Sequence, residues 1–170
     1  VLHINNEKAA EVIADPRVMA VTLTGSERAG RSVASTAGQN LKKCVLELGG
    51  SDPFIVLDDA ELEATVKVAV ASRFGNAGQT CIAAKRFIVT PGIADRFVQA
   101  FAAAASELAV GDPNDDATSL APMARADLRD ELHRQVQDSV AKGARLLLGG
   151  QPGRGDTHYP ATILDGVKPG

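Results

Sequence analysis

Short apolar runs of β type alternate with helical segments along the chain, and this alternation limits the possible folds more than any other feature of the sequence. The predicted helices cover residues 7–14, 27–39, 62–74, 94–108 and 124–141, and the predicted strands cover residues 18–23, 43–48, 54–57, 86–90, 146–148 and 159–164. Because strands separated by helices usually pair in parallel, we predict an α/β fold with largely parallel sheets. A glycine-rich loop is expected at residues 149–155.

Gly49-Gly50 is the candidate domain boundary, because one helix–strand unit ends there and another begins. The break extends to Pro53, and Asp58-Asp59 is expected to start the helix that follows the next strand. We therefore expect two parts, residues 1–50 and residues 51–170.

The composition disfavours several classes of function. Hydrophobic residues make up 45% and charged residues 23% of the 170 positions, which suits a globular core. A formal net charge of -3, without a basic cluster interleaved with aromatics, argues against a nucleic-acid partner. No apolar stretch approaches the roughly 18 residues of a membrane span, so we expect no membrane role. Two cysteines cannot make a disulfide framework, which favours a reducing compartment, and we expect a cytoplasmic location.

Cys81 is the first candidate for chemistry. It ends the run Phe74-Gly-Asn-Ala-Gly-Gln-Thr-Cys81, in which small residues would let a substrate approach closely. In a loop beside a helix, free backbone N–H groups stabilise a thiolate, which is the nucleophilic form. The alternative is a buried structural cysteine, the commoner state of a free cysteine taken alone. The glycines and the polar Gln79 and Thr80 build cores poorly, which weakens that alternative.

Glu47 is the only charged residue in the apolar run at residues 44–48. Because side chains alternate along a strand, Glu47 points to the opposite face from Leu46 and Leu48. It is either a solvent-facing residue of a half-exposed sheet or a placed general base. Gly49-Gly50 slightly favours the second reading, because glycines at the end of a parallel strand let a ligand come close.

The turn Thr24-Gly25-Ser26 ends a predicted strand and opens a predicted helix. Its N–H groups and the helix dipole suit a phosphate group. The turn lacks the GxGxxG pattern, and on its own it is better explained as a helix start capped by Ser26.

No metal site or Cys–His pair is expected. The sequence alone places none of His3, His133 and His158 near Cys81, so thiol activation by a histidine lacks support. The aspartates at residues 111–116 read as a solvated turn, because they lack a recognised ligand spacing.

Three motifs, in this order, resemble the aldehyde dehydrogenase superfamily. They are Thr22-Leu-Thr-Gly-Ser26 with Gly30-Arg31, then Leu46-Glu-Leu-Gly-Gly50 with Pro53, then Asn76-Ala-Gly-Gln-Thr-Cys81 with Arg86. Segments at residues 120–123, 143–150 and 160–164 also look like the family, so the resemblance covers nearly the whole chain. It implies that residues 1–50 are the C-terminal end of a Rossmann-like dinucleotide-binding domain. It also implies that residues 51–170 are part of an α/β catalytic domain.

The resemblance implies oxidation of an aldehyde to a carboxylic acid with NAD or NADP as cofactor. The Cys81 thiolate attacks the aldehyde to give a thiohemiacetal, whose oxyanion is held partly by the Cys81 N–H. After hydride transfer to the nicotinamide, Glu47 activates the water that hydrolyses the thioester.

Four residues match family positions around the cofactor. Gly25 and Ser26 correspond to positions near the pyrophosphate, and Thr24 and Leu48 to positions near the nicotinamide.

The motifs also point to a branch of the family. Glu47 favours hydrolysis, because similar enzymes that pass the acyl group to coenzyme A lack this glutamate. Residues 50–54 and 79–82 look most like the succinate-semialdehyde dehydrogenase branch. Some members of that branch carry a redox-active cysteine two positions after the nucleophile, where this chain has Ala83, so we expect no such switch in this loop.

The chain starts at Val1 without an initiator methionine or a signal-peptide pattern, and we expect it to be an internal piece of a longer protein. The family's segments that complete the oxyanion hole and the cofactor site have no counterpart here. We therefore expect the 170 residues alone to be inactive and the full-length protein to be a homo-oligomer. The alternatives are a non-catalytic truncated scaffold and a thiol acyltransferase or hydrolase, which would need a histidine beside Cys81.

Overall fold

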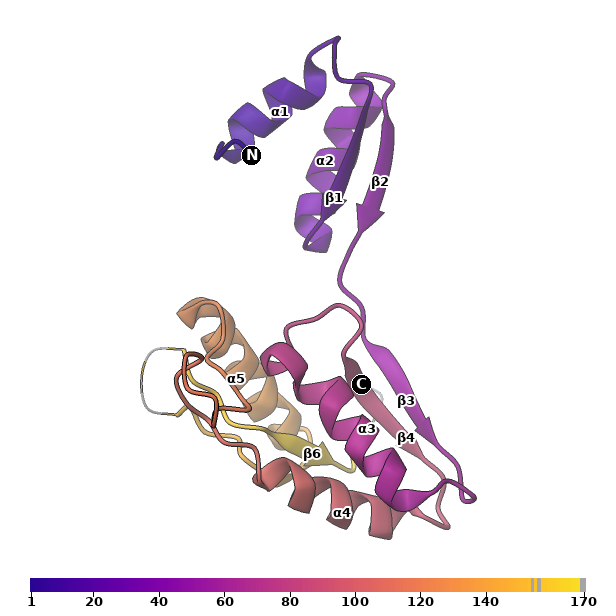
Figure 1. Ribbon diagram of the computed structural model, residues 1–170. Coiled ribbons are helices and arrows are strands. Elements are labelled where there is room, and N and C mark those ends of the chain that lie inside the picture. The colour runs from indigo at the N-terminus through magenta and orange to yellow at the C-terminus, as the bar shows by residue number, and fades with distance from the viewer. Residues whose placement is uncertain (154, 156, 169–170) are drawn as a thin grey trace. The chain divides into compact units, whose positions relative to one another are not determined.

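The computed structural model describes residues 1–153, 155 and 157–168 (Figure 1). The chain divides into two compact units, Val1–Gly50 and Ser51–Gly170, and each is described by itself. Arg154, which falls in the loop predicted at residues 149–155, lies outside the described residues. Within the described part of the chain, no helix is long and apolar enough to cross a membrane.

The first unit is a two-stranded parallel sheet with two helices. Its elements in chain order are α1 (Asn6–Ala14), β1 (Ala20–Thr24), α2 (Glu27–Gln39) and β2 (Lys43–Glu47). Asn5 caps α1 by accepting a hydrogen bond from the Lys8 N–H at 2.9 Å. In the strand register Val21 lies opposite Cys44 and Thr24 opposite Glu47, so the two strands end together.

Helix α2 covers one face of this sheet. Val21, Leu23, Cys44 and Leu46 are half-buried on that face, whereas the residues between them are exposed. The alternation expected around Glu47 is therefore confirmed. On the helix side, Gly30 and Ala37 are buried, and the small size of Gly30 lets the Leu48 side chain lie directly against α2.

A lysine ties α1 to the segment before β2. The Lys42 ammonium donates to the carbonyl oxygens of Ile13 and Asp15 at 2.5 Å each, where α1 ends and positive charge is favoured. The Arg17 side chain and backbone N–H both donate to the Asp15 carboxylate, which lowers the pKa of Asp15 to about 2.

The second unit begins with a parallel β–α–β arrangement followed by a helix. Its first elements are β3 (Asp52–Val56), α3 (Leu62–Phe74), the 3-10 turn η1 (Gly75–Gly78), β4 (Ala84–Val89) and α4 (Ala94–Ser106). β3 and β4 pair in parallel, and α3 packs against both β4 and α4 (Figure 1).

The unit ends with α5 (Ala126–Ala141), β5 (Arg145–Leu148) and β6 (Ile163–Asp165). β5 and β6 form a separate antiparallel pair. The main core cluster combines residues of β3, α3 and α4 with Ile93, which precedes α4, and with two residues from the later segments. Its buried members are Val56, Val66, Ala69, Phe74, Ile93, Phe97, Phe101, Ala105, Leu120 and Ala161.

Several element boundaries differ from the predictions. β3 already begins at Asp52, before the predicted start at Phe54, because proline is tolerated near the start of a strand. The strand register is irregular between Asp52 and Pro53. The N-cap of α3 is Glu61 rather than Asp58-Asp59, and the Asp58 carboxylate instead accepts a hydrogen bond from the Thr90 hydroxyl at 2.5 Å.

The prediction of largely parallel pairing holds for β1–β2 and β3–β4, whereas the last pair is an exception. β5 and β6 are antiparallel, and among the described residues between them there is no helix of the kind that usually connects parallel strands. The strand predicted at residues 159–164 starts only at Ile163, and Pro160 has no N–H for a ladder. Just before β6, the Thr162 hydroxyl donates to the Pro160 carbonyl oxygen and accepts from the Gly150 N–H.

Replacing Gly30 with alanine tests the contact between α2 and Leu48. A Cβ at Gly30 would meet Leu48 Cδ2 at 2.8 Å, so we expect Gly30→Ala to lower the free energy of unfolding by about 1–3 kcal/mol in urea denaturation. Gly38→Ala, in the same helix with open space around it, is the control and should be neutral or stabilising by about 0.5–1 kcal/mol. Equal effects of the two substitutions would contradict this packing.

Candidate active site

The ends of β1 and β2 bring the predicted cofactor residues next to Glu47. Thr24 lies opposite Glu47 in the ladder, and the Gly25 N–H donates to the Glu47 carbonyl oxygen at 2.9 Å. The Glu47 side chain is exposed and points away from α2. The carboxylate is therefore accessible at the carboxyl end of a parallel strand, where ligand sites of α/β folds usually form.

The N-terminus of α2 follows directly. Ser26 caps the helix by accepting a hydrogen bond from the Ala29 N–H at 3.2 Å, which confirms the predicted helix start. The Glu27 carboxylate pairs with Arg31 at 3.4 Å on the exposed side of the helix. A shallow depression beside α2 is lined by Glu27, Arg31, Ala34, Leu46, Leu48 and Gly49.

These residues fit a dinucleotide. The first N–H groups of a helix have no intrahelical partner, and the helix dipole favours a phosphate there. Gly25 leaves room at this turn, because a Cβ there would meet nothing closer than 3.7 Å. Leu48 sits against Gly30 and adds an apolar surface next to the strand ends.

In the second unit, Cys81 is exposed in the turn between η1 and β4. In this chain the thiol is therefore not in the buried position that a structural cysteine would take. Three consecutive residues before it adopt left-handed backbone conformations, with φ of 53° at Asn76, 52° at Ala77 and 72° at Gly78. Left-handed backbone at alanine is unfavourable and persists only where surrounding contacts enforce it.

Hydrogen bonds from α3 and β4 enforce the conformation of this loop. The Arg73 guanidinium donates to the carbonyl oxygens of Gly78 at 2.7 Å and Ala84 at 3.1 Å. The Ser72 hydroxyl accepts from the Ala84 N–H at 3.3 Å, and the Lys85 ammonium donates to the Cys81 carbonyl oxygen at 3.2 Å. The loop is thus anchored on both sides of the thiol.

Gln79 links the loop to a distant part of the same unit. Its backbone N–H donates to the Asn76 carbonyl oxygen at 3.0 Å, which closes the left-handed turn. Its side-chain oxygen accepts from the Ala124 N–H at 2.9 Å. The segment before α5 therefore supports the loop that carries Cys81.

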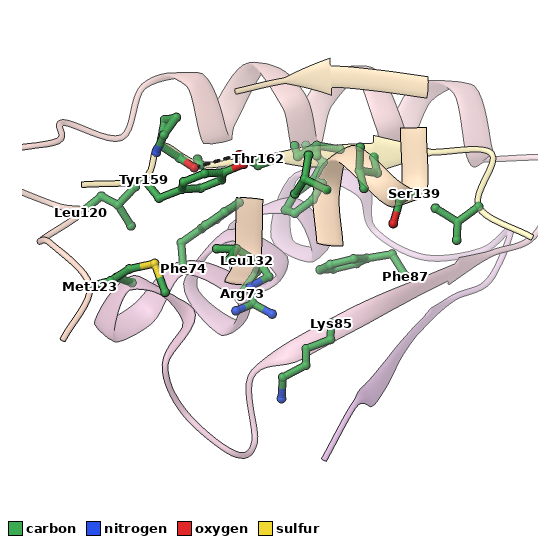
Figure 2. Close-up of a pocket in the computed structure, with 18 residues that line it drawn as sticks. Arg73, Phe74, Lys85, Phe87, Leu120, Met123, Leu132, Ser139, Tyr159 and Thr162 are labelled. Atoms are coloured by element: carbon green, nitrogen blue, oxygen red, sulfur yellow. Dashed lines mark hydrogen bonds between the residues drawn. The ribbon is translucent and has the colours of Figure 1, made fainter. Parts of the chain in front are cut away.

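A cavity of about 350 Å³ lies within this unit next to the base of the loop. Arg73, Ala77 and Lys85 belong to its lining together with apolar side chains such as Phe87. Figure 2 shows the nitrogen-bearing ends of Arg73 and Lys85 on the side of the cavity away from Tyr159. Burial lowers the pKa of Arg73, but an arginine side chain in a protein remains a cation at neutral pH.

Tyr159, which lines this cavity, forms a pair with His133. His133 Nδ1 lies 3.0 Å from the Tyr159 hydroxyl oxygen, and burial raises the pKa of Tyr159. In the described part of the chain, no histidine shares a hydrogen bond with Cys81.

The predicted turn of aspartates behaves as a capped loop. Asp112 accepts hydrogen bonds from the backbone and side-chain N–H groups of Asn114, both at 2.9 Å, which lowers the pKa of Asp112. Asp115 accepts from the Ala117 N–H at 2.9 Å. Among the residues that the structure describes, no group of three or more His, Cys, Asp or Glu is placed to hold a metal ion.

The predicted site residues fall into two groups. Thr24, Gly25, Ser26, Glu47 and Leu48 come together in the first unit, and Cys81 belongs to the second. Sequence reasoning did not identify the residues that hold the Cys81 loop. Arg73 could have been singled out from the sequence, because it is a basic residue in the last turn of a predicted helix that leads into a glycine-containing loop.

The chain belongs to the aldehyde dehydrogenase family, whose model, described as Aldehyde dehydrogenase family, matches residues 1–170. Succinate semialdehyde dehydrogenase (NAD(P)+) Sad of Escherichia coli (strain K12) is 57% identical over 169 residues, which are 99% of this chain and 37% of that protein. A succinate-semialdehyde dehydrogenase (NADP(+)) of Mycobacterium avium (strain 104) is 50% identical over 167 residues, 98% of this chain and 35% of that protein.

Comparison with solved structures supports the same family. Succinate-semialdehyde dehydrogenase from Burkholderia pseudomallei matches with a TM-score of 0.95 and 37% identity, over 99% of this chain and 35% of that one. Succinic semialdehyde dehydrogenase from Streptococcus pyogenes in complex with NADP+ matches with a TM-score of 0.93 and 43% identity, over 97% of this chain and 36% of that one. The family resemblance and the α/β fold class are confirmed. The chain spans little more than a third of these relatives.

The left-handed turn leads to a prediction about the effect of replacing Gly78 on stability. Its φ is +72°, and a Cβ there would meet Arg73 Nη2 at 1.9 Å and the Arg73 carbonyl oxygen at 3.0 Å. We expect Gly78→Ala to lower the free energy of unfolding by about 1–2 kcal/mol, because alanine is strained in this backbone region. Chemical denaturation measures the effect. Gly75→Ala, which has open space and a φ of -52°, is the control and should change stability far less.

Proposed function

We propose that the complete protein oxidises an aldehyde to a carboxylic acid with NAD or NADP, using Cys81 as the nucleophile. The observation that carries this proposal is the exposed Cys81 thiol on a loop with three consecutive left-handed residues, in a chain of the aldehyde dehydrogenase family. Strained backbone held by several contacts is typical of functional sites.

In this mechanism the Cys81 thiolate adds to the carbonyl carbon of the aldehyde. The carbonyl oxygen becomes an oxyanion, which the Cys81 backbone N–H helps to stabilise. NAD or NADP, when bound, supplies the acceptor for the hydride whose loss turns this thiohemiacetal into a thioester.

Glu47 is proposed as the general base of the second half of the reaction. Its carboxylate takes a proton from water as the water oxygen attacks the thioester carbon. The carbon–sulfur bond breaks, the acid leaves and the Cys81 thiolate is regenerated. The exposure of Glu47 at the carboxyl end of β2 supports this role, because water reaches the carboxylate there.

Thr24, Gly25, Ser26 and Leu48 are proposed to hold the cofactor. The N-terminus of α2 behind Gly25 and Ser26 suits a pyrophosphate, and Thr24 and Leu48 would border the nicotinamide. On this proposal, residues 1–50 are the C-terminal end of a dinucleotide-binding domain and residues 51–170 are part of the catalytic domain.

Succinate semialdehyde is the proposed substrate, because the relatives described above carry succinate-semialdehyde dehydrogenase in their names. Both NAD(P)+ and NADP+ occur in those names. We further propose a homo-oligomer in the cytoplasm, where the free cysteines Cys44 and Cys81 would stay reduced. No observation favours a thiol hydrolase or acyltransferase, which would need a histidine at Cys81.

Glu47→Gln in the complete protein tests the assignment of the general base. We expect a rapid burst of NAD(P)H, because acylation of Cys81 does not use Glu47, followed by a steady-state rate lower by about 100-fold or more. Stopped-flow absorbance at the NAD(P)H band measures both phases, and mass spectrometry should find the acyl group on Cys81. An unchanged steady-state rate would refute the role of Glu47.

Matched controls accompany this test. Glu63→Gln, at an exposed position in the first turn of α3, should keep wild-type kinetics. Cys81→Ser should abolish both burst and turnover, whereas Cys44→Ala, at the half-buried cysteine of β2, should keep them.

A substrate panel tests the proposed aldehyde. We expect the complete protein to have a higher kcat/KM for succinate semialdehyde than for the uncharged butyraldehyde, by about 10-fold or more, because a site built for a carboxylate loses charge-assisted hydrogen bonds with the neutral analogue. The 170-residue chain in the same assay should give no turnover. Equal kcat/KM values for the two aldehydes would exclude succinate semialdehyde as the preferred substrate.

A further inference from the structure

Arg73 hydrogen-bonds to the backbone on both sides of Cys81. Its Nη2 donates to the carbonyl oxygen of Gly78 at 2.7 Å and its Nη1 to that of Ala84 at 3.1 Å. Cys81 lies between these two acceptors in the chain. Because a guanidinium holds its N–H groups in one rigid plane, these two bonds fix the separation of the two ends of the loop.

The two ends of the loop differ in how much support they have without Arg73. The exit is buried, since Ala83 and Ala84 are 1% and 3% exposed, and Ser72 also binds the Ala84 N–H. The entry is the left-handed run at residues 76–78, where the backbone needs external contacts to persist. Arg73 therefore connects the strained entry to the rigid exit.

The fit between Arg73 and Gly78 is close. A Cβ at Gly78 would meet Arg73 Nη2 at 1.9 Å, so only glycine leaves the space that this guanidinium occupies. The guanidinium is part-buried and donates to backbone carbonyl oxygens, and hydrogen bonds from a charged donor are stronger than those between neutral groups. The absence of a side chain at Gly78 is thus what lets the Arg73 guanidinium bind the loop backbone.

We propose that Arg73 is a positioning residue for the nucleophile. Through the carbonyl oxygens of Gly78 and Ala84 it holds the backbone conformation that presents the Cys81 thiol and N–H to the substrate. Arg73 itself touches neither the thiol nor the substrate in this role. The consequence for turnover rests on the proposed function of Cys81, whereas the effect on the reactivity of the thiol does not.

The experiment uses the complete protein with Arg73→Ala and Arg73→Lys. Two rates are measured: alkylation of Cys81 by iodoacetamide, followed by mass spectrometry of the Cys81 peptide, and the NAD(P)H burst with aldehyde. We expect both to fall by about 10- to 100-fold in Arg73→Ala, because small displacements of a reacting group have effects of this size. KM should change little, since the binding residues remain in place.

Added methylguanidinium should restore part of both rates in Arg73→Ala. Arg73→Lys should be slower than wild type, because one ammonium cannot hold two carbonyl groups in the fork geometry of a guanidinium. Arg96→Ala, at an exposed arginine of α4, is the matched control and should behave as wild type.

Wild-type alkylation and burst rates in Arg73→Ala would overturn the proposal. A rate loss that methylguanidinium does not reverse, and that equals the loss of folded protein measured by circular dichroism, would also overturn it. If Arg73→Ala does not fold, Arg73→Lys decides: a wild-type alkylation rate in that variant overturns the proposal. If Cys81→Ser keeps the burst while alkylation of Cys81 still depends on Arg73, the proposed function fails and the positioning role stands.

Discussion

The packing of five phenylalanines is the interaction on which the Cys81 loop depends. Phe74 ends α3 and Phe87 lies in β4, so these two rings flank the loop in the chain. Both pack against Phe101 of α4, with ring centroids 6.1 Å and 4.7 Å away. Phe97, 1% exposed, lies 5.5 Å from Phe101, and Phe54 of β3 completes the cluster at 5.3 Å from Phe87. Buried aromatic surface of this kind contributes much of the stability of a small core. By fixing α3 against β4, it sets the gap that the loop must bridge.

Across that fixed gap, polar contacts select one loop conformation. The aromatic cluster holds Phe74 and Phe87, and the Arg73 guanidinium and Ser72 hydroxyl bind the backbone between them. The left-handed residues 76–78 are the geometric result of turning the chain within so few residues. Apolar packing makes α3 and β4 rigid relative to each other, and the hydrogen bonds then fix the position of the Cys81 thiol.

In the first unit the equivalent constraint is strand register. Because β1 and β2 pair in parallel with Thr24 opposite Glu47, the turn at Gly25 and the carboxylate emerge at the same edge, and the Gly25 N–H binds the Glu47 carbonyl oxygen. Leu48 packs against Gly30 and holds α2 over the sheet. A shift of one residue in this register would turn Glu47 towards α2 and Leu46 towards the exposed face.

The sequence by itself determined the α/β class, the α2 and α3 helices, the Ser26 cap and the alternation around Glu47, because these follow from local periodicity and capping chemistry. The ordered motifs around Glu47 and Cys81 also identified the family from the residues alone. Only the tertiary structure decided that β5 and β6 are antiparallel and that Arg73 binds both ends of the Cys81 loop. The physical reason is that strand direction and side-chain-to-backbone contacts depend on which segments pack together, and that packing involves residues far apart in the chain.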